Sequence, residues 1–171
     1  MKKSAWYFNA VLWAVDRGIT SGTDETHFSP DAYCTREQVV TFLWRAMGAP
    51  EPKGNDCTFV DVPADSYYRK AVLWAAEQGI TSGVDETHFG SGRYCTRAQV
   101  VTFLYKAKGS PDVAASDRFD DVSESDYFYH SVLWASENGI TSGVDGEHFG
   151  PHQICTRAQI VTFLYKADQI S

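Results

Sequence analysis

The chain has 171 residues, of which 43% are hydrophobic and 14% aromatic, a composition typical of a folded domain and not of a disordered segment. Its formal net charge is −7, with 15 lysines and arginines against 22 aspartates and glutamates, which argues against a basic nucleic-acid-binding surface. No apolar run approaches the roughly 18–20 residues needed to cross a bilayer, so we expect no membrane insertion.

The first predicted element is an amphipathic helix over residues 5–17. Its apolar face is formed by Tyr7, Ala10, Val11 and Ala14. Asn9 interrupts the apolar stretch, so the segment does not have the pattern of a signal peptide. Gly18 supplies the left-handed residue that ends a helix, and Ile19 can then fold back over the last turn.

A loop and a second helix follow. The loop TSGTDETHF (20–28) is rich in glycine and aspartate, which suit tight turns, and Phe28 is predicted to anchor it in the core. The second helix begins within CTREQVVTFLWRA (34–46). There Thr35 is a predicted N-cap, and Gln38, three residues later, completes a capping box.

This helix-loop-helix unit occurs three times, which predicts a mainly α protein built from tandem repeats. The first helices are expected over 5–17, 66–78 and 126–138, each with a tryptophan at the same place in the repeat. Polar, proline-containing linkers separate the units. We therefore divide the chain into repeat 1 (1–53), repeat 2 (54–115) and repeat 3 (116–171), packed as one domain.

The sequences FVDV (59–62) and FDDV (119–122) precede the first helices of repeats 2 and 3. We expect each to be a short extended segment. Repeat 1 has no counterpart and begins directly at SAWYF. The chain is thus expected to be either cut inside its first repeat or a natural fragment.

An arginine occupies the first helical position after each capping threonine: Arg36, Arg97 and Arg157. There it faces the positive end of the helix dipole, at a cost of about 0.3–1 kcal/mol when exposed. One interpretation is a clamp for an anion at the helix start, since guanidinium binds carboxylate or phosphate in a bidentate manner. The other is a salt bridge to the neighbouring repeat. Spacing alone does not decide between them.

The order F-x-D-V, aromatic helix, W-A-x-x-x-G-I-x-x-G, aspartate loop ending in F and T-R-x-Q resembles the S-layer homology (SLH) repeat over nearly the whole chain. The resemblance implies a pseudo-threefold, monomeric domain with ligand grooves between repeats. It also implies non-covalent attachment to a bacterial cell-wall polysaccharide, often bearing pyruvate ketals. The expected location is extracellular, at the bacterial cell surface or cell wall, as a module of a larger surface protein.

The family's helix-start motif T-R-A-E matches 35–38, 96–99 and 156–159, with Gln in place of the final Glu. A carboxylate ketal would suit the arginines, tryptophan rings could stack on sugars, and the Ser-Gly pairs could donate hydrogen bonds. The predicted ligand-binding residues are Arg36, Arg97, Arg157, Thr35, Thr96, Thr156, Ser82, Gly83, Ser142, Gly143, Trp74 and Trp134. Because repeat 1 lacks its F-x-D-V segment, grooves that use Arg97 and Arg157 are preferred over one that uses Arg36 alone.

The four cysteines are expected to be free and mostly buried. His27, His88 and His148 each precede a cysteine by seven residues, a spacing that matches no short zinc signature, so no metal site is predicted. The sequence contains no recognisable catalytic motif, and we expect neither an enzyme nor a cofactor. The alternative function is a structural or protein–protein interaction module without a glycan site, in which the arginines only join the repeats.

Overall fold

The computed structural model describes residues 2–114 and 118–170. Within these ranges it has six helices and no strands, which confirms the mainly α class and the three tandem helix-loop-helix repeats. The helices are α1 (Phe8–Asp16), α2 (Arg36–Ala46), α3 (Arg69–Glu77), α4 (Arg97–Ala107), α5 (Tyr129–Glu137) and α6 (Arg157–Asp168). None of them has the length and apolar character required to cross a membrane.

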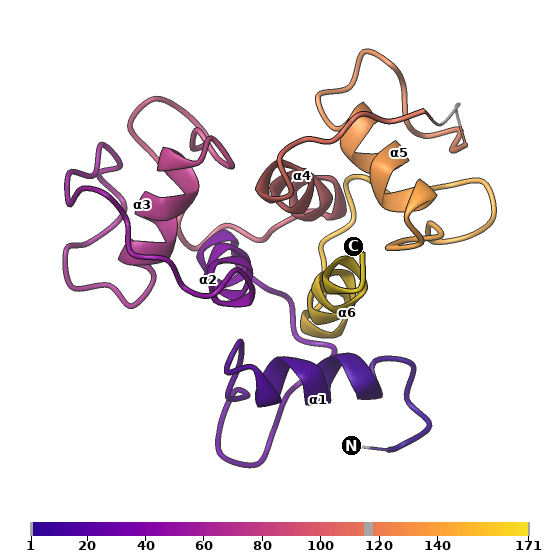
Figure 1. The fold of residues 1–171 in the computed structure, drawn as a ribbon, viewed down its shortest axis with the longest axis horizontal. Helices are drawn as coiled ribbons and strands as arrows, with labels where there is room; N and C mark the ends of the chain where they lie inside the picture. The colour runs from indigo at the N-terminus through magenta and orange to yellow at the C-terminus, as the bar shows by residue number, and fades with distance from the viewer. Residues whose placement is uncertain (1, 115–117, 171) are drawn as a thin grey trace.

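The helices are arranged around a pseudo-threefold axis (Figure 1). The second helices of the repeats, α2, α4 and α6, stand at the centre and contact one another, while α1, α3 and α5 lie outside them. Each central helix packs mainly against the outer helix of the next repeat: α2 on α3, α4 on α5 and α6 on α1. The last pair joins the two ends of the chain, so the repeats form a closed ring.

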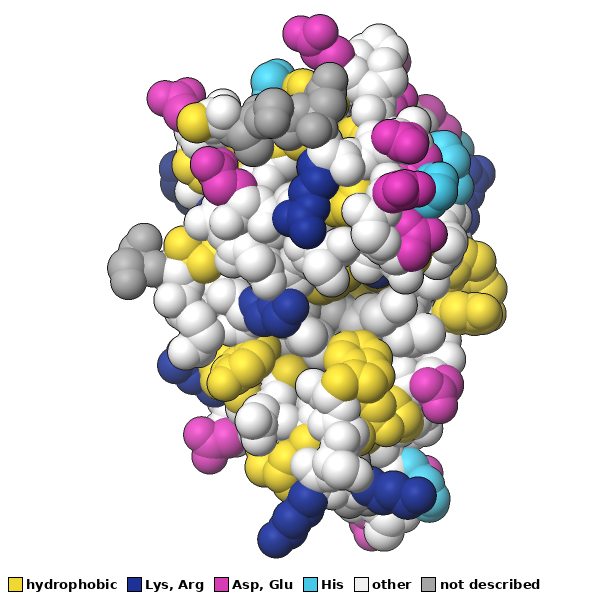
Figure 2. All heavy atoms as spheres, turned by 90° about the vertical axis from the view of Figure 1, so that its right-hand side faces the viewer, with side chains coloured by type: hydrophobic (Ala, Val, Ile, Leu, Met, Phe, Trp, Pro, Cys, Tyr) yellow, Lys and Arg dark blue, Asp and Glu magenta, His cyan; other side chains and the backbone are white. Residues whose placement is uncertain are grey.

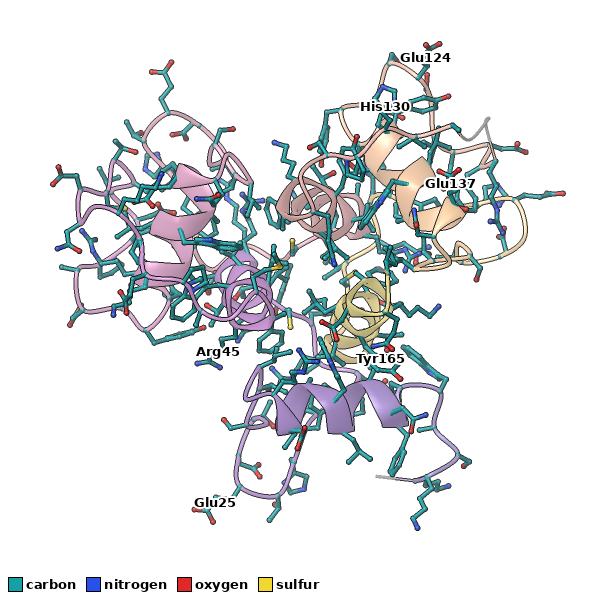
Figure 3. The ribbon with its side chains drawn as sticks, in the orientation of Figure 1. Glu25, Arg45, Glu124, His130, Glu137 and Tyr165 are labelled. Atoms are coloured by element: carbon teal, nitrogen blue, oxygen red, sulfur yellow. The ribbon has the colours of Figure 1, made fainter. Side chains whose placement is uncertain are left out.

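The contact between α1 and α6 that closes the ring is well defined. Trp13 Nε1 donates a hydrogen bond to Asp168 Oδ2 at 3.1 Å, and the rings of Trp13 and Tyr165 are 5.7 Å apart. Tyr165 lies between α6 and α1 in Figure 3. Tyr105 of α4 and Trp134 of α5 make the equivalent ring contact at 5.6 Å. Repeats 1 and 3 are thus joined as repeats 2 and 3 are.

The outer helices begin three residues later and end one residue earlier than predicted. The residues before them form a turn, in which the amide of Phe8, for example, donates to the carbonyl oxygen of Ala5 at 2.9 Å. At the other end Gly18 has φ +65°, and the amide of Ile19 reaches the carbonyl oxygen of Ala14 at 2.8 Å. This is the Schellman pattern, and Ile19 is fully buried beneath it.

The three central helices start together at the axis. Thr96 and Gln99 form the predicted capping box: the Thr96 amide donates to Gln99 Oε1 at 3.1 Å, and Thr96 Oγ1 accepts from the Gln99 amide at 3.4 Å. Just before these caps, backbone amides of one repeat donate to carbonyl oxygens of another. Cys34 donates to Cys155 at 3.3 Å, Cys95 to Cys34 at 3.0 Å, and Cys155 to Cys95 at 3.0 Å. The three repeats are therefore joined by a cyclic set of hydrogen bonds.

The F-x-D-V segments are turns, so the expectation of extended segments was wrong. The amide of Val62 donates to the carbonyl oxygen of Phe59 within one turn. This turn points the Asp61 carboxylate at the loop of the same repeat, where it accepts hydrogen bonds from the amides of Phe89, Gly90 and Ser91 at 2.7, 2.7 and 2.8 Å. The segment thus holds the loop before the central helix in place.

Candidate functional site

The three motif arginines lie buried between repeats, with side chains only 3–5% exposed. Each guanidinium is sandwiched by two phenyl rings of the next repeat, one from its loop and one from its central helix. Arg36 Cζ lies 5.1 Å from the ring centre of Phe89 and 5.2 Å from that of Phe103. The other two sandwiches are Arg97 with Phe149 and Phe163, and Arg157 with Phe28 and Phe42. Such cation–π contacts favour a buried positive charge.

Through its Nε atom, each guanidinium holds the loop of the next repeat in place. Nε of Arg36 donates to the carbonyl oxygen of Phe89 at 3.0 Å, and the equivalent bonds of Arg97 and Arg157 measure 2.9 and 2.8 Å. In two copies a terminal nitrogen also reaches a threonine: Arg97 Nη2 to Thr141 at 3.3 Å, and Arg157 Nη2 to Thr20 at 3.1 Å. The arginines therefore do join the repeats, but through carbonyl and hydroxyl oxygens.

No carboxylate within residues 2–114 and 118–170 forms a salt bridge with Arg36, Arg97 or Arg157; the ion pairs of that part of the chain lie elsewhere. Burial lowers the pKa of Arg36 and Arg97, because loss of solvent disfavours the charged guanidinium. The salt bridges expected from the structural alternative do not occur in this described part. Each buried charge therefore has no ionic partner among the residues that the structure describes.

A groove of about 350 Å³ opens beside Arg36. Repeat 2 supplies most of its wall, including the predicted Ser82 and Gly83, while Arg36 comes from repeat 1 and Tyr127 from repeat 3. Lys106, on α4, adds a second positive charge to the lining. The groove therefore combines two cations, hydroxyl groups and an aromatic ring that is 68% exposed.

The absence of an F-x-D-V segment from repeat 1 affects the surroundings of Arg157 and not, as expected, those of Arg36. Each arginine crosses into the next repeat, so the loop of repeat 1 contacts Arg157 through Phe28 and Thr20. Arg36 instead contacts the loop of repeat 2, which Asp61 holds in place. The preference for the groove at Arg157 over that at Arg36 therefore rested on the wrong pairing of arginine and loop.

The predicted tryptophans are not available as sugar platforms. Trp74 and Trp134 are 6% and 3% exposed because they pack in the hydrophobic core. Aromatic side chains are exposed instead at Trp6, Tyr67 and Tyr127, each the first member of the aromatic pair that precedes an outer helix. The sequence signal for them was present: these positions lie outside the apolar stripe that faces the core. Tyr33 and Tyr94, ahead of α2 and α4, are exposed as well.

Most of the backbone donors assigned to a ligand are already used within the protein. The amide of Gly83 donates to Thr81 Oγ1 at 3.1 Å, and that of Gly143 to Thr141 Oγ1 at 3.1 Å. At the start of α4, the amide of Arg97 donates to the carbonyl oxygen of Gln153 at 2.8 Å. The starts of α2 and α6 are closed in the same way: the amide of Arg36 donates to the carbonyl oxygen of Arg93 at 2.9 Å and that of Arg157 to Ala32 at 2.8 Å. Thr96 and Thr156 also cap their own helices. The first amide of each central helix is therefore already bonded within the protein, which leaves side chains as the groups for an anion.

The cysteines and histidines do not form a common metal site in the described residues. All four cysteines are free, and burial raises the pKa of Cys34 to about 11 and that of Cys155 to about 12. The loop histidines are exposed and bind aspartates, as His27 Nδ1 does with Asp24 at 2.9 Å. The described residues contain no group of three potential metal ligands.

Charge on the visible face is mixed. Figure 2 shows acidic side chains mainly in the upper half of one face, with lysines and arginines scattered over both halves. An anion would therefore be held by a few placed cations, such as Arg36 and Lys106, and not by a basic surface.

Comparison with known proteins gives a consistent match. The S-layer homology domain model matches residues 1–40, 58–101 and 118–161. The chain is 30% identical over 146 residues to the "Surface-layer 125 kDa protein" of Lysinibacillus sphaericus, covering 83% of the chain and 12% of that protein. It is 29% identical over 174 residues to the "Cell surface protein" of Thermoanaerobacter kivui, covering 99% and 21%. It is also 30% identical over 176 residues to an "Endoglucanase" of Bacillus sp. (strain KSM-635), covering 97% and 18%. The chain thus spans about a fifth or less of these relatives.

Proposed function

The chain belongs to the S-layer homology domain family, and we propose that it binds an anionic cell-wall polysaccharide in the grooves between its repeats. The family match and the surface-layer relatives identify it as a cell-surface anchoring module, non-catalytic and located at the cell surface or cell wall. We further propose that the polysaccharide carries pyruvate ketals, whose carboxylate is the group that the arginines receive.

The observation that carries this proposal is a buried guanidinium without a counter-charge. Arg36 is 4% exposed, meets no described carboxylate within salt-bridge distance, and lines an open groove. A buried charge is costly unless it is paired. A ligand carboxylate would supply the missing pair, and the planar guanidinium offers it two parallel hydrogen bonds. Lys106 would add a second favourable charge.

The remaining lining suits a sugar that bears such a carboxylate. The groove volume, about 350 Å³, is in the usual range for small-molecule sites, about 300–1,000 Å³. Ser82 offers a hydroxyl group, and Tyr127 offers an exposed ring face. Gly83 forms part of the wall, and the close packing of the His88 and Asp85 carbonyl oxygens against it leaves no room for a side chain there.

We assign equivalent sites to Arg97 with Ser142 and Gly143, and to Arg157. Thr35, Thr96 and Thr156 would act by positioning the arginines at the helix starts. Binding by several weak sites on one polymer would gain avidity through effective concentration. This suits an anchor, since one groove need not hold the polymer alone.

A purely structural role for the arginines is the second candidate. It is favoured by the bonds from Nε to the loop carbonyl oxygens and by the phenyl sandwiches. An alanine variant would remove both roles at once, because it takes away packing between repeats as well as the ligand contact. The decisive variants therefore change groove residues that do not join the repeats.

Lys106→Ala and Tyr127→Ala are such variants, because both side chains are exposed. Binding to purified polysaccharide should weaken about 5- to 30-fold in each, since a charge-assisted or stacking contact contributes about 1–2 kcal/mol. Lys53→Ala, an exposed lysine outside the groove, is the control for charge. Polymer from which pyruvate has been removed should bind the parent protein weakly. The Lys106→Ala variant should bind that polymer no more weakly than the parent does.

Thermal unfolding of all variants would establish that they remain folded. If both groove variants bind as tightly as the Lys53→Ala control, the Arg36 groove is not the binding site. If removal of pyruvate leaves binding unchanged while the groove variants lose it, the site is correct and the carboxylate is not its ligand.

A further inference from the structure

Exposed apolar side chains gather at the end of the pseudo-threefold axis where the central helices α2, α4 and α6 begin. Tyr33, Tyr94 and Ile154 hold the same position in the three repeats, each one residue ahead of an axial cysteine. They are 54%, 54% and 36% exposed. The rings of Tyr33 and Tyr94, which we call the axial tyrosines, have their centres 5.7 Å apart and their planes inclined by 64°. Neither belongs to the lining of the groove beside Arg36.

The backbone holds the axial tyrosines rigidly, because the residues on both sides of each are bonded to another repeat. Before Tyr94, the carbonyl oxygen of Arg93 accepts from the amide of Arg36 at 2.9 Å. After it, the amide of Cys95 donates to the carbonyl oxygen of Cys34 at 3.0 Å. The tyrosine of repeat 1 is fixed in the same way by two bonds to repeat 3. The two rings therefore form a surface whose shape is set before any ligand arrives.

The exposure of these rings belongs to their position and not to the start of repeat 1. Repeat 2 has its F-x-D-V turn, with Asp61 bonded to the loop of the same repeat. Tyr94 of that repeat is nevertheless exposed to the same extent as Tyr33 of repeat 1. Repeat 3 also has its F-x-D-V segment, and Ile154 is exposed there too.

The patch is too small for a protein partner and has the size of a sugar ring. A fully covered aromatic side chain buries about 150–250 Å², so two half-exposed tyrosines and a third of an isoleucine offer roughly 200–300 Å². A stable protein interface covers about 800 Å² on each partner. A sugar ring has an apolar C–H face and a rim of hydroxyl groups. The axial tyrosines match it with apolar rings and with hydroxyl groups that bond to no residue in the described part of the chain.

The axial tyrosines also lie close to the groove beside Arg36. The backbone of Arg36 is bonded to Arg93, the residue directly before Tyr94, while the side chain of Arg36 lines the groove. A polymer with one unit in this groove therefore has its neighbouring units within reach of the axial tyrosines.

We propose that Tyr33 and Tyr94 form a second kind of binding site, a stacking platform for an uncharged sugar unit of the cell-wall polysaccharide. The inference rests on the proposed function in that it takes the same polymer as its ligand. The groove receives the unit that carries the carboxylate, and the platform receives a unit without charge. Ile154 has no ring, so it extends the apolar surface without providing a stacking face.

The test titrates Tyr33→Ala and Tyr94→Ala with purified polysaccharide and with the same polymer after removal of pyruvate. Each variant should bind both polymers about 3- to 10-fold more weakly than the parent, because each loses one stacking contact. Tyr94→Phe keeps the ring and should retain most of the binding. Ile154→Ala is the matched control, since it removes an exposed apolar side chain from the third equivalent position, and it should bind both polymers as the parent does.

NMR of the unaltered protein localises the contact without any substitution. The aromatic ring signals of Tyr33 and Tyr94 should shift when polymer without pyruvate is added. Thermal unfolding would establish that the variants remain folded.

Lys106→Ala separates the platform from the groove, because it should weaken binding only to the polymer that carries pyruvate. If Lys106→Ala and removal of pyruvate have no effect while both tyrosine variants lose binding, the carboxylate groove is wrong and the platform stands. The platform is overturned if the tyrosine variants bind both polymers as Ile154→Ala does, if the tyrosine ring signals do not shift, or if the parent binds neither polymer. It is overturned equally if sedimentation shows that the axial tyrosines join two copies of this chain.

Discussion

Replacement of Asp61 tests whether the F-x-D-V turn holds its loop. Asp61 accepts hydrogen bonds from the amides of Phe89, Gly90 and Ser91, at 2.7–2.8 Å. In Asp61→Ala these amides lose their acceptor. A hydrogen bond to a charged group contributes about 1.5–3 kcal/mol, so we expect the free energy of unfolding to fall by roughly 2–4 kcal/mol. For a protein of this size, Tm would fall by roughly 5–15 °C.

The pH dependence identifies the carboxylate as the cause. Burial alone would raise the pKa of Asp61, but the backbone hydrogen bonds outweigh it and hold the pKa below its ordinary value. Such a group stabilises the fold above its unfolded pKa, near about 3.9, and the contribution is lost as pH falls through the lower folded value. The difference between the parent and Asp61→Ala should therefore be complete at neutral pH and shrink in acid below about pH 4.

Urea denaturation at several pH values measures both effects. Asp65→Ala is the matched control, because Asp65 is exposed and makes no hydrogen bond in the described structure. The reasoning is refuted if Asp61→Ala is no less stable than Asp65→Ala at pH 7. It is refuted equally if the difference persists unchanged in acid.

Three further outcomes are expected. A thiol reagent at pH 8 should modify Cys57 first and the three fully buried cysteines only on unfolding, as mass spectrometry would show; rapid labelling of all four would contradict their burial. Gly83→Ala should cost about 3 kcal/mol or more in urea denaturation, because its Cβ would meet backbone carbonyl oxygens, whereas Gly79→Ala, with open space around it, should cost about 1–2 kcal/mol. Gln99→Glu should preserve the capping box but weaken polysaccharide binding several-fold, since it adds a carboxylate to the groove of Arg36; unchanged binding would exclude Gln99 from the site.

Helix ends could be predicted because the interactions that set them are local. The Schellman pattern at Gly18 spans six residues, and the capping box of Thr96 and Gln99 spans four. Such patterns start or end a helix regardless of what the helix packs against. The repeat count follows equally directly, since three copies of one pattern need no knowledge of contacts.

The groove chemistry could be predicted only in part, because it depends on which repeat meets which. Arg97 donates to the carbonyl oxygen of Phe149, 52 residues away, and no local sequence pattern predicts that pairing. The use of helix-start amides by loop carbonyl oxygens, as between Arg97 and Gln153, has the same origin. Trp74 was misjudged because one tryptophan per repeat fits a core position as well as a sugar platform.

The two interpretations of the arginines do not exclude each other, because a guanidinium has two distinct edges. Nε is committed to a loop carbonyl oxygen, and the planar group is held between two phenyl rings, so its orientation is fixed before any ligand arrives. A lysine could not serve both purposes, since its ammonium group has neither the plane that stacks nor the second set of donors. In the proposed site, the bond that joins the repeats would also fix the orientation of the donors of Arg36 that remain for a ligand in the groove. This accounts for an arginine at a helix start, where the dipole disfavours it: the small cost of about 0.3–1 kcal/mol is offset by the repeat contact, and an anion in the groove would reverse its sign.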